Sequence, residues 1–114
     1  MILDEIVEDK KKRLTCHKKN VSETEIRRVA ESVEKIPHRF YDALKKEQIS
    51  IIGEFKNASP SLEKIKSKIN LEERIKEYNV SVDAISCLTQ EDHFHGNVDY
   101  LKYIRGISPL PILR

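Results

Sequence analysis

Ile49-Ser-Ile-Ile-Gly-Glu-Phe-Lys-Asn-Ala-Ser-Pro-Ser61 is the stretch that decides the fold of this chain. It opens with an apolar, β-branched run of strand length and closes with Ser59-Pro60-Ser61, a turn signal. Glu54 and Lys56 stand where the strand ends, and because side chains alternate along a strand, both share a face with Ile52. An acid and a base side by side at the carboxyl end of a buried strand are typical of an α/β active site.

The residues after this stretch alternate between strand and helix patterns. The strands are expected at about 49–56, 83–89 and 110–114, and the helices between them at about 71–78 and 98–105. The second strand is a nearly unbroken apolar run, which is typical of parallel strands buried on both faces. Gly106 suits the C-terminus of the last helix. The pattern therefore predicts an α/β fold with an unfinished parallel sheet.

A helical lead-in precedes this pattern, with helices expected at about 2–18, 22–33 and 39–46. Ser22-Glu-Thr-Glu25 has the sequence of a capping box, in which the Ser22 hydroxyl accepts from the Glu25 amide while the Glu25 side chain reaches back. We therefore expect a helical extension over residues 1–47 and an α/β part over residues 48–114.

Charge and composition exclude several classes of protein. The 21 Lys and Arg and 19 Asp and Glu are interspersed, with a net charge of +2, so nucleic-acid binding is not indicated. The basic run Lys10-Lys11-Lys12-Arg13 is interpreted as a solvated helix face with i,i+4 ion pairs. Cys16 and Cys87 resemble free thiols of a reducing cytosol, and no signal peptide or membrane span is evident. A cytoplasmic protein is expected.

Asp92-His-Phe-His-Gly96 follows the second strand. Its His93 and His95 could bind a metal, but without a third and fourth ligand this spacing is weak evidence. A flexible loop over a site is favoured instead, with Phe94 as an apolar wall and Gly96 as a hinge. From the residues alone, Glu54 and Lys56 are equally consistent with proton transfer, with anion binding and with a structural ion pair.

At this point the chain resembles a known family. Ile51-Ile-Gly-Glu-Phe-Lys-Asn-Ala-Ser-Pro-Ser61 is similar to the signature of indole-3-glycerol phosphate synthase. The other similar stretches are Met1 to Lys12, Phe40 to Leu44, Ala84 to Thr89 with Phe94-His-Gly96, and Leu110 to Arg114.

The resemblance implies a (β/α)8 barrel and a lyase that needs no cofactor or metal. The reaction would be ring closure of 1-(2-carboxyphenylamino)-1-deoxyribulose 5-phosphate, with loss of carbon dioxide and water, in tryptophan biosynthesis. By the same resemblance, Lys56 would face the substrate's anionic groups and assist acid catalysis, and Glu54 would orient it. Ser59 and Ser61 would belong to a substrate-binding mobile loop, and Phe94 would pack against the substrate's aromatic ring.

The chain also departs from the family pattern. Leu62-Glu63 replaces the usual Lys-Gly, Val80 stands where glycine is common, and His93 and His95 occupy positions that are more often aromatic or small. In the family a lysine that is the principal general acid follows Leu-Arg, and here Leu-Arg ends at Arg114.

A whole barrel takes about 250 residues. We therefore expect an N-terminal fragment that is inactive alone and that self-associates through exposed strand edges, with no nucleic-acid or membrane partner. The alternative is a small non-enzymatic α/β module that binds an anionic partner.

Overall fold

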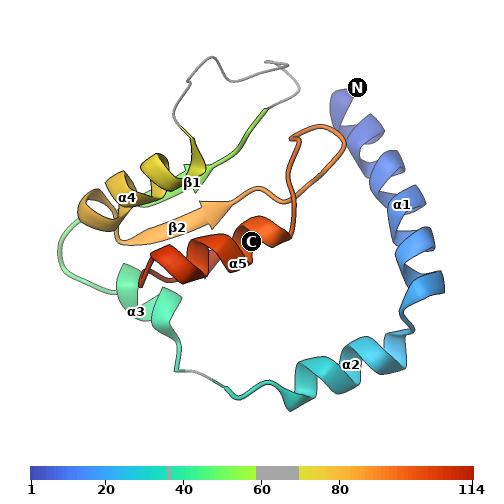
Figure 1. Ribbon diagram of the computed structural model, residues 1–114, viewed down its shortest axis with the longest axis horizontal. Coiled ribbons are helices and arrows are strands. Elements are labelled where there is room, and N and C mark those ends of the chain that lie inside the picture. Colours follow the sequence, from blue (N-terminus) through green and yellow to red (C-terminus); the bar gives the residue numbers. More distant parts are fainter. Residues whose placement is uncertain (36, 59–69) are drawn as a thin grey trace. The chain divides into compact units, whose positions relative to one another are not determined.

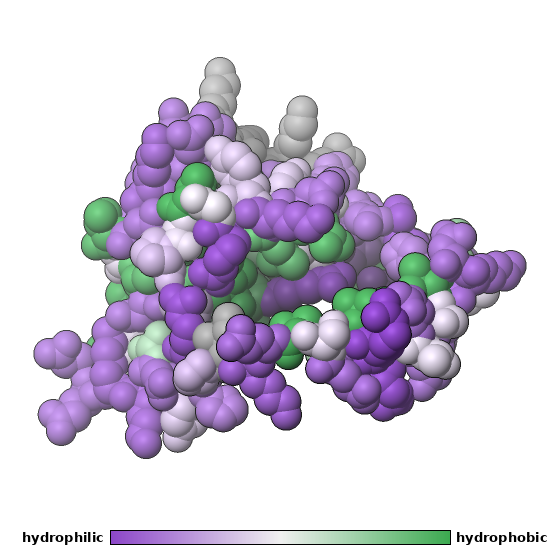
Figure 2. Space-filling model, turned by 60° about the horizontal axis from the view of Figure 1, so that its bottom comes forward, coloured by the Kyte–Doolittle hydropathy of each residue, from purple (hydrophilic) through white to green (hydrophobic). Residues whose placement is uncertain are grey.

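The computed structural model describes residues 1–35, 37–58 and 70–114 (Figure 1). The chain divides into two compact units, Met1–Pro37 and His38–Arg114, and each is described by itself. Hydrophilic residues dominate the face drawn in Figure 2, and hydrophobic residues reach the surface among them. In the described ranges, no helix is long and apolar enough to cross a membrane.

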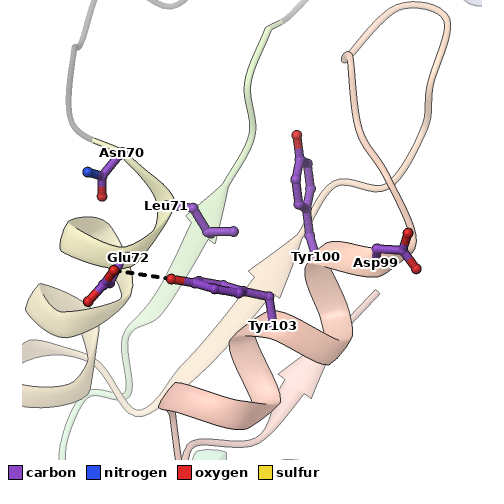
Figure 3. Close-up of a pocket in the computed structure, with 6 residues that line it drawn as sticks. All are labelled: Asn70, Leu71, Glu72, Asp99, Tyr100 and Tyr103. Atoms are coloured by element: carbon purple, nitrogen blue, oxygen red, sulfur yellow. Dashed lines mark hydrogen bonds between the residues drawn. The ribbon is translucent and has the colours of Figure 1, made fainter.

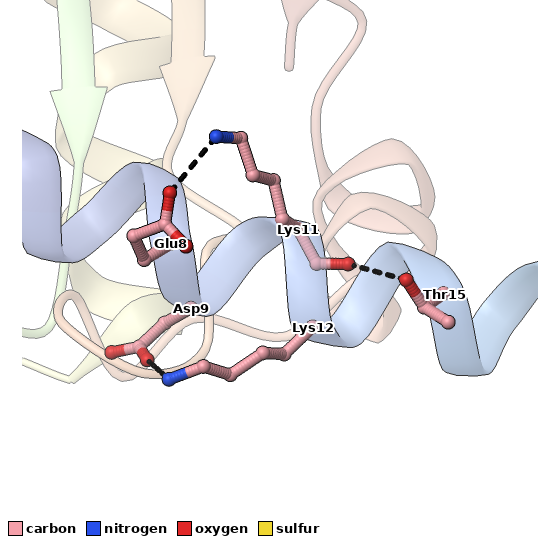
Figure 4. A network of polar contacts seen from close by, with 5 residues as sticks. All are labelled: Glu8, Asp9, Lys11, Lys12 and Thr15. Atoms are coloured by element: carbon pink, nitrogen blue, oxygen red, sulfur yellow. Dashed lines mark hydrogen bonds and ion pairs between the residues drawn. The ribbon is translucent and has the colours of Figure 1, made fainter.

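The first unit contains a long helix, α1 (Ile2–Asn20), whose charged residues pair along its surface. Lys11 Nζ lies 2.9 Å from a Glu8 carboxylate oxygen, and Lys12 Nζ lies 3.1 Å from one of Asp9 (Figure 4). The residues of these two pairs are three positions apart, whereas a spacing of four was predicted. Both spacings bring side chains together on one face of a helix. The basic run is thus a solvated, ion-paired helix face.

A second helix, α2 (Glu23–Ser32), follows in the same unit. Its first turn is capped as predicted on one side, since the Ser22 hydroxyl accepts from the Glu25 amide at 3.2 Å. The Glu25 carboxylate instead accepts two hydrogen bonds from Arg28, at 3.0 and 2.7 Å. This contact lowers the pKa of the Glu25 carboxyl. The capping box is therefore only half formed.

The second unit is an α/β unit with a parallel three-stranded sheet in the order β1-β2-β3, as the sequence predicted. Its elements are α3 (Arg39–Leu44), β1 (Ile52–Phe55), α4 (Leu71–Ser81), β2 (Ala84–Cys87), α5 (Asp99–Ile107) and β3 (Ile112–Leu113). The sheet is not closed, and each outer strand has one neighbour among the described residues.

The element boundaries differ from the sequence predictions at several ends. The first strand begins at Ile52 rather than near 49, because the Asp83 side chain takes the Ile51 N–H that would otherwise serve a strand. Helix α4 runs on to Ser81, past the predicted 78. Gly106 lies within the last turn of α5 rather than after it, and the helix ends where Ser108 takes an extended conformation.

The core lies between one face of the sheet and helices α4 and α5. Phe55, Ile75, Ile85 and Ile104 are all buried there, and partly buried side chains such as Tyr78 pack around them. Burial alternates along β1, so Phe55 points to the helices. The expectation of burial on both faces concerned the second strand and is confirmed for β2, where Ala84, Ile85 and Cys87 are buried. Strand β1 is buried on one face only, since Ile52 on the other face is 44% exposed. Within the second unit, no described segment covers that face of β1 sufficiently to bury it.

Candidate active site

The predicted acid–base pair forms at the carboxyl end of β1. Lys56 Nζ lies 3.3 Å from Glu54 Oε1, and the two side chains are 40% and 44% exposed. Both residues lie on the face of β1 that turns away from the helices, as the alternation of the strand predicted. The pair can therefore reach a ligand from that face.

Tyr78 on α4 supports the strand that carries this pair. Its hydroxyl donates to the Glu54 carbonyl oxygen at 2.6 Å. Burial raises the pKa of the Tyr78 hydroxyl, which keeps it protonated as a donor. Its ring lies so close to Gly53 that a Cβ there would come within 2.9 Å of three ring atoms. Gly53 is thus required by a close approach of the ring to the strand backbone.

Asn57, which no sequence pattern singled out, joins the end of β1 to the segment after β2. Its Nδ2 donates to the His95 carbonyl oxygen at 3.2 Å and to the Tyr100 hydroxyl oxygen at 2.7 Å. The Tyr100 ring packs edge-on against Phe55, with the ring centroids 5.6 Å apart. The only hint of this role in the sequence is that Asn57 is a polar residue directly after Lys56. Its hydrogen-bond partners lie far along the chain, so local spacing could not identify them.

The loop between β2 and α5 brings Phe94 to the same edge of the sheet. Phe94 is partly buried, and its backbone N–H donates to Gln90 Oε1 at 3.2 Å. Gly96 has a packing role, because a Cβ there would come 2.5 Å from the Leu88 carbonyl oxygen, and its expected role as a hinge stays a prediction. His95 adopts a left-handed backbone conformation, with φ of 49°.

A third strand contributes a charge at this edge. Arg114 Nε donates to the Thr89 hydroxyl oxygen at 3.0 Å, and Thr89 follows the end of β2. The carboxyl ends of all three strands therefore carry polar side chains, among them the cations Lys56 and Arg114. Such an edge can hold an anionic ligand. No group of three or more metal-ligating side chains is present in the described part of the chain.

Other predicted residues lie elsewhere. Ser59 and Ser61, together with Leu62-Glu63, lie outside the described residues. A surface pocket of about 470 Å³ lies between the first turns of α4 and α5, and Figure 3 shows Tyr103 pointing across it to Glu72. Among the described residues, its lining shares none with the predicted site. The pocket is thus a feature of the helix layer.

Comparison with known proteins decides the family. A family model described as indole-3-glycerol phosphate synthase matches residues 3–114. The chain belongs to this family. Curated relatives named indole-3-glycerol phosphate synthase include a protein of Lachnospira eligens, 59% identical over 114 residues. A protein of Clostridium acetobutylicum is 41% identical over 115 residues, and one of Acetivibrio thermocellus is 45% identical over 120 residues.

The chain spans less than half the length of these relatives. Each alignment covers 100% of this chain and 42%, 44% and 45% of the three relatives respectively. Indole-3-glycerol phosphate synthase is a TIM barrel, and this chain covers its N-terminal part. In such barrels active sites lie at the carboxyl ends of the strands. Glu54 and Lys56 lie at this edge of the sheet, and the loop that carries Phe94 adjoins it.

Proposed function

We propose that this chain supplies Glu54 and Lys56 to the active site of an indole-3-glycerol phosphate synthase. That site would close and decarboxylate 1-(2-carboxyphenylamino)-1-deoxyribulose 5-phosphate to give indole-3-glycerol phosphate. The observation that carries the proposal is the 3.3 Å ion pair at the carboxyl end of β1, in a chain of this family. No observation favours the alternative of a non-enzymatic module that binds an anionic partner.

Lys56 would act on the substrate as a cation. Its ammonium group projects from the open face of β1 and would meet the anionic groups of the substrate and assist acid catalysis. The Glu54 carboxylate forms an ion pair with the ammonium and would orient it. Because Lys56 is 40% exposed, a substrate can reach it without displacing protein atoms.

The aromatic part of the substrate would be held by the second loop. Phe94 would pack against the substrate's aromatic ring, a contact worth about 0.5–1.5 kcal/mol beyond the area that it buries. Ser59 and Ser61 would bind the substrate from the segment after β1. The remaining strands of the barrel would supply the principal general acid and the phosphate site, as the resemblance implies. Residues 1–47 would form a helical extension ahead of the barrel strands.

We also propose that the chain associates with itself when those further strands are absent. Strands β1 and β3 each have one neighbour among the described residues, which leaves backbone groups of both strands open to pairing. Apolar side chains near these strands are exposed, with Ile49 at 88%, Ile52 at 44% and Leu113 at 49%.

We further propose a cytoplasmic location, because the free thiols Cys16 and Cys87 fit a reducing compartment.

The experiment uses a joined chain, in which residues 1–114 are fused to the part of the Lachnospira eligens relative beyond the matched region. Lys56→Met is expected to lower kcat by about 10²- to 10⁴-fold, because a positioned acid contributes that much. Glu54→Gln is expected to lower kcat as well, because the ammonium loses its partner. The control is Lys102→Met on the exposed surface of α5, which should stay within about twofold. Equal rates for Lys56→Met and Lys102→Met would overturn the proposal.

A further inference from the structure

Gln90, three residues after the end of β2, hydrogen-bonds to both ends of the loop that carries Phe94. The Gln90 side-chain Oε1 accepts from the backbone N–H of His93 at 2.8 Å and from that of Phe94 at 3.2 Å. The Gln90 main-chain oxygen accepts from the N–H of Gly96 at 2.8 Å. One residue therefore fixes the backbone immediately before Phe94 and the backbone two residues after it.

The amide nitrogen of the Gln90 side chain, in contrast, makes no hydrogen bond to a described residue. This Nε2 atom is buried. A buried amide donor without an acceptor opposes folding, so nearly all such groups in proteins are paired. At Gln90 the Nε2 donor is left unpaired among the described residues, while Oε1 of the same amide accepts two hydrogen bonds. The acceptor end of the side chain is thus the part that the loop needs.

Asn57 holds the same loop from the side of β1. Its Nδ2 donates to the carbonyl oxygen of His95, the residue after Phe94. With Gln90 Oε1 on the Phe94 N–H, the backbone on both sides of Phe94 is hydrogen-bonded to side chains from the ends of two neighbouring strands. The place of the Phe94 side chain is therefore set relative to the strand edge that carries Lys56.

We propose that Gln90 is a positioning residue that fixes Phe94 through its Oε1 atom alone. The effect of Gln90 on substrate binding rests on the proposed function, in which Phe94 contacts the substrate's aromatic ring. The hydrogen bonds from the loop backbone to Gln90 do not depend on that function. Gln90→Met keeps the length of the side chain and removes the acceptor. Gln90→Glu keeps the acceptor and removes the Nε2 donor.

The test measures the loop directly in residues 1–114. Amide hydrogen exchange is followed by NMR at His93 and Phe94, and fluorophenylalanine labelling reports on Phe94, whose resonance is assigned with Phe94→Leu. Gln90→Met is expected to lower exchange protection at both amides by roughly tenfold or more, and to broaden or split the Phe94 fluorine line. Gln90→Glu at neutral pH is expected to retain both the protection and the single line. Gln48→Met, at an exposed position, is the control.

Two results would overturn this inference. A match between Gln90→Met and the control, at both amides and in the fluorine line, would show that Oε1 does not fix the loop. A loss of protection in Gln90→Glu as large as that in Gln90→Met would show that the nitrogen is required. Both measurements are made without substrate. A failure of the proposed enzymatic function would therefore leave them standing, and a failure here would not affect the role of Lys56.

Discussion

Gly53 shows how a single residue supports the site without touching a ligand. The Tyr78 ring occupies the space where a Cβ at residue 53 would lie, and the Tyr78 hydroxyl holds the Glu54 carbonyl oxygen. The backbone of β1 next to the acid–base pair is therefore supported by an aromatic side chain from α4. The close approach of the Tyr78 ring is the physical reason for a glycine at this position.

Replacement of Gly53 is expected to destabilise the second unit. In Gly53→Ala the new methyl group would overlap the Tyr78 ring, and such overpacking costs about 1–3 kcal/mol of the free energy of unfolding. The measurement is urea unfolding, followed by circular dichroism. In a Tyr78→Leu background the same replacement should cost clearly less, because the overlapping ring is gone.

Gly106→Ala is the matched control, because Gly106 lies within helix α5 with no heavy atom within 4 Å of the added Cβ. This change should stabilise the protein by about 0.5–1 kcal/mol through helix propensity. If Gly53→Ala and Gly106→Ala shifted the unfolding midpoint in the same direction, the packing role of Gly53 would be refuted.

At the same scale, the sequence could predict Glu54, Lys56 and Phe94 but not Asn57 or Gln90. The first three stand out through local spacing and through the family signature. Gln90 bonds to backbone N–H groups, and Asn57 bonds to one backbone oxygen and to the Tyr100 hydroxyl. The partners of Asn57 lie some 40 residues further along the chain, with separations of 38 and 43. Polar side chains that bond to backbone are common at turns, so their residue types alone carry little information.

At the scale of elements, the type and order of every described helix and strand followed from periodicity, whereas their ends did not. Strand β1 begins at Ile52 because the Asp83 side chain binds the preceding backbone: Asp83 Oδ2 accepts from the Ile51 N–H at 2.8 Å. The other carboxylate oxygen, Oδ1, lies 2.5 Å from Lys46 Nζ. Helix α4 is capped by Asn70, whose Oδ1 accepts from the Glu73 amide at 2.9 Å. Side chains that compete with or complete backbone bonding thus set the boundaries.

Asp83 gives the junction of β1 and β2 a defined pH dependence. The hydrogen bond from Lys46, followed by that from the Ile51 N–H, holds the pKa of the Asp83 carboxyl below its usual value. Its contribution to stability is therefore fully present above the pKa of the unfolded chain, about 3.9. It is lost as the pH falls through the lower folded-state pKa.

We expect Asp83→Asn to lower the thermal unfolding midpoint near neutral pH, and the difference from the unsubstituted chain to shrink below about pH 4. Thermal unfolding at a series of pH values measures this difference. Asp42→Asn, at an exposed position on α3, is the control and should show a much smaller difference at neutral pH. A difference for Asp83→Asn that grew on acidification would contradict the expected sign.

At the scale of the whole molecule, the alternation of strands and helices predicted a parallel sheet, and the structure has one that is open at both edges in its described part. The sequence could not predict that the Ile52 face of β1 is uncovered, since burial depends on segments far from the strand. The same open face that exposes Ile52 also leaves Glu54 and Lys56 accessible.

Residues 1–114 alone are expected to form dimers or larger assemblies through these edges. Sedimentation velocity over a range of concentrations measures this. Introducing charge with Leu113→Lys, at the half-exposed end of β3, should shift the distribution toward monomer. A single monomeric species with full secondary structure at all concentrations would contradict the expectation.

Glu54 and Lys56 are proposed to form one wall of a site that further barrel strands complete. Turnover of 1-(2-carboxyphenylamino)-1-deoxyribulose 5-phosphate tests this proposal when it is measured for residues 1–114 alone, for the joined chain, and for the joined chain with Lys56→Met. We predict that indole-3-glycerol phosphate is formed at full rate by the unsubstituted joined chain only. Turnover by residues 1–114 alone, or an undiminished rate with Lys56→Met, would contradict the proposal.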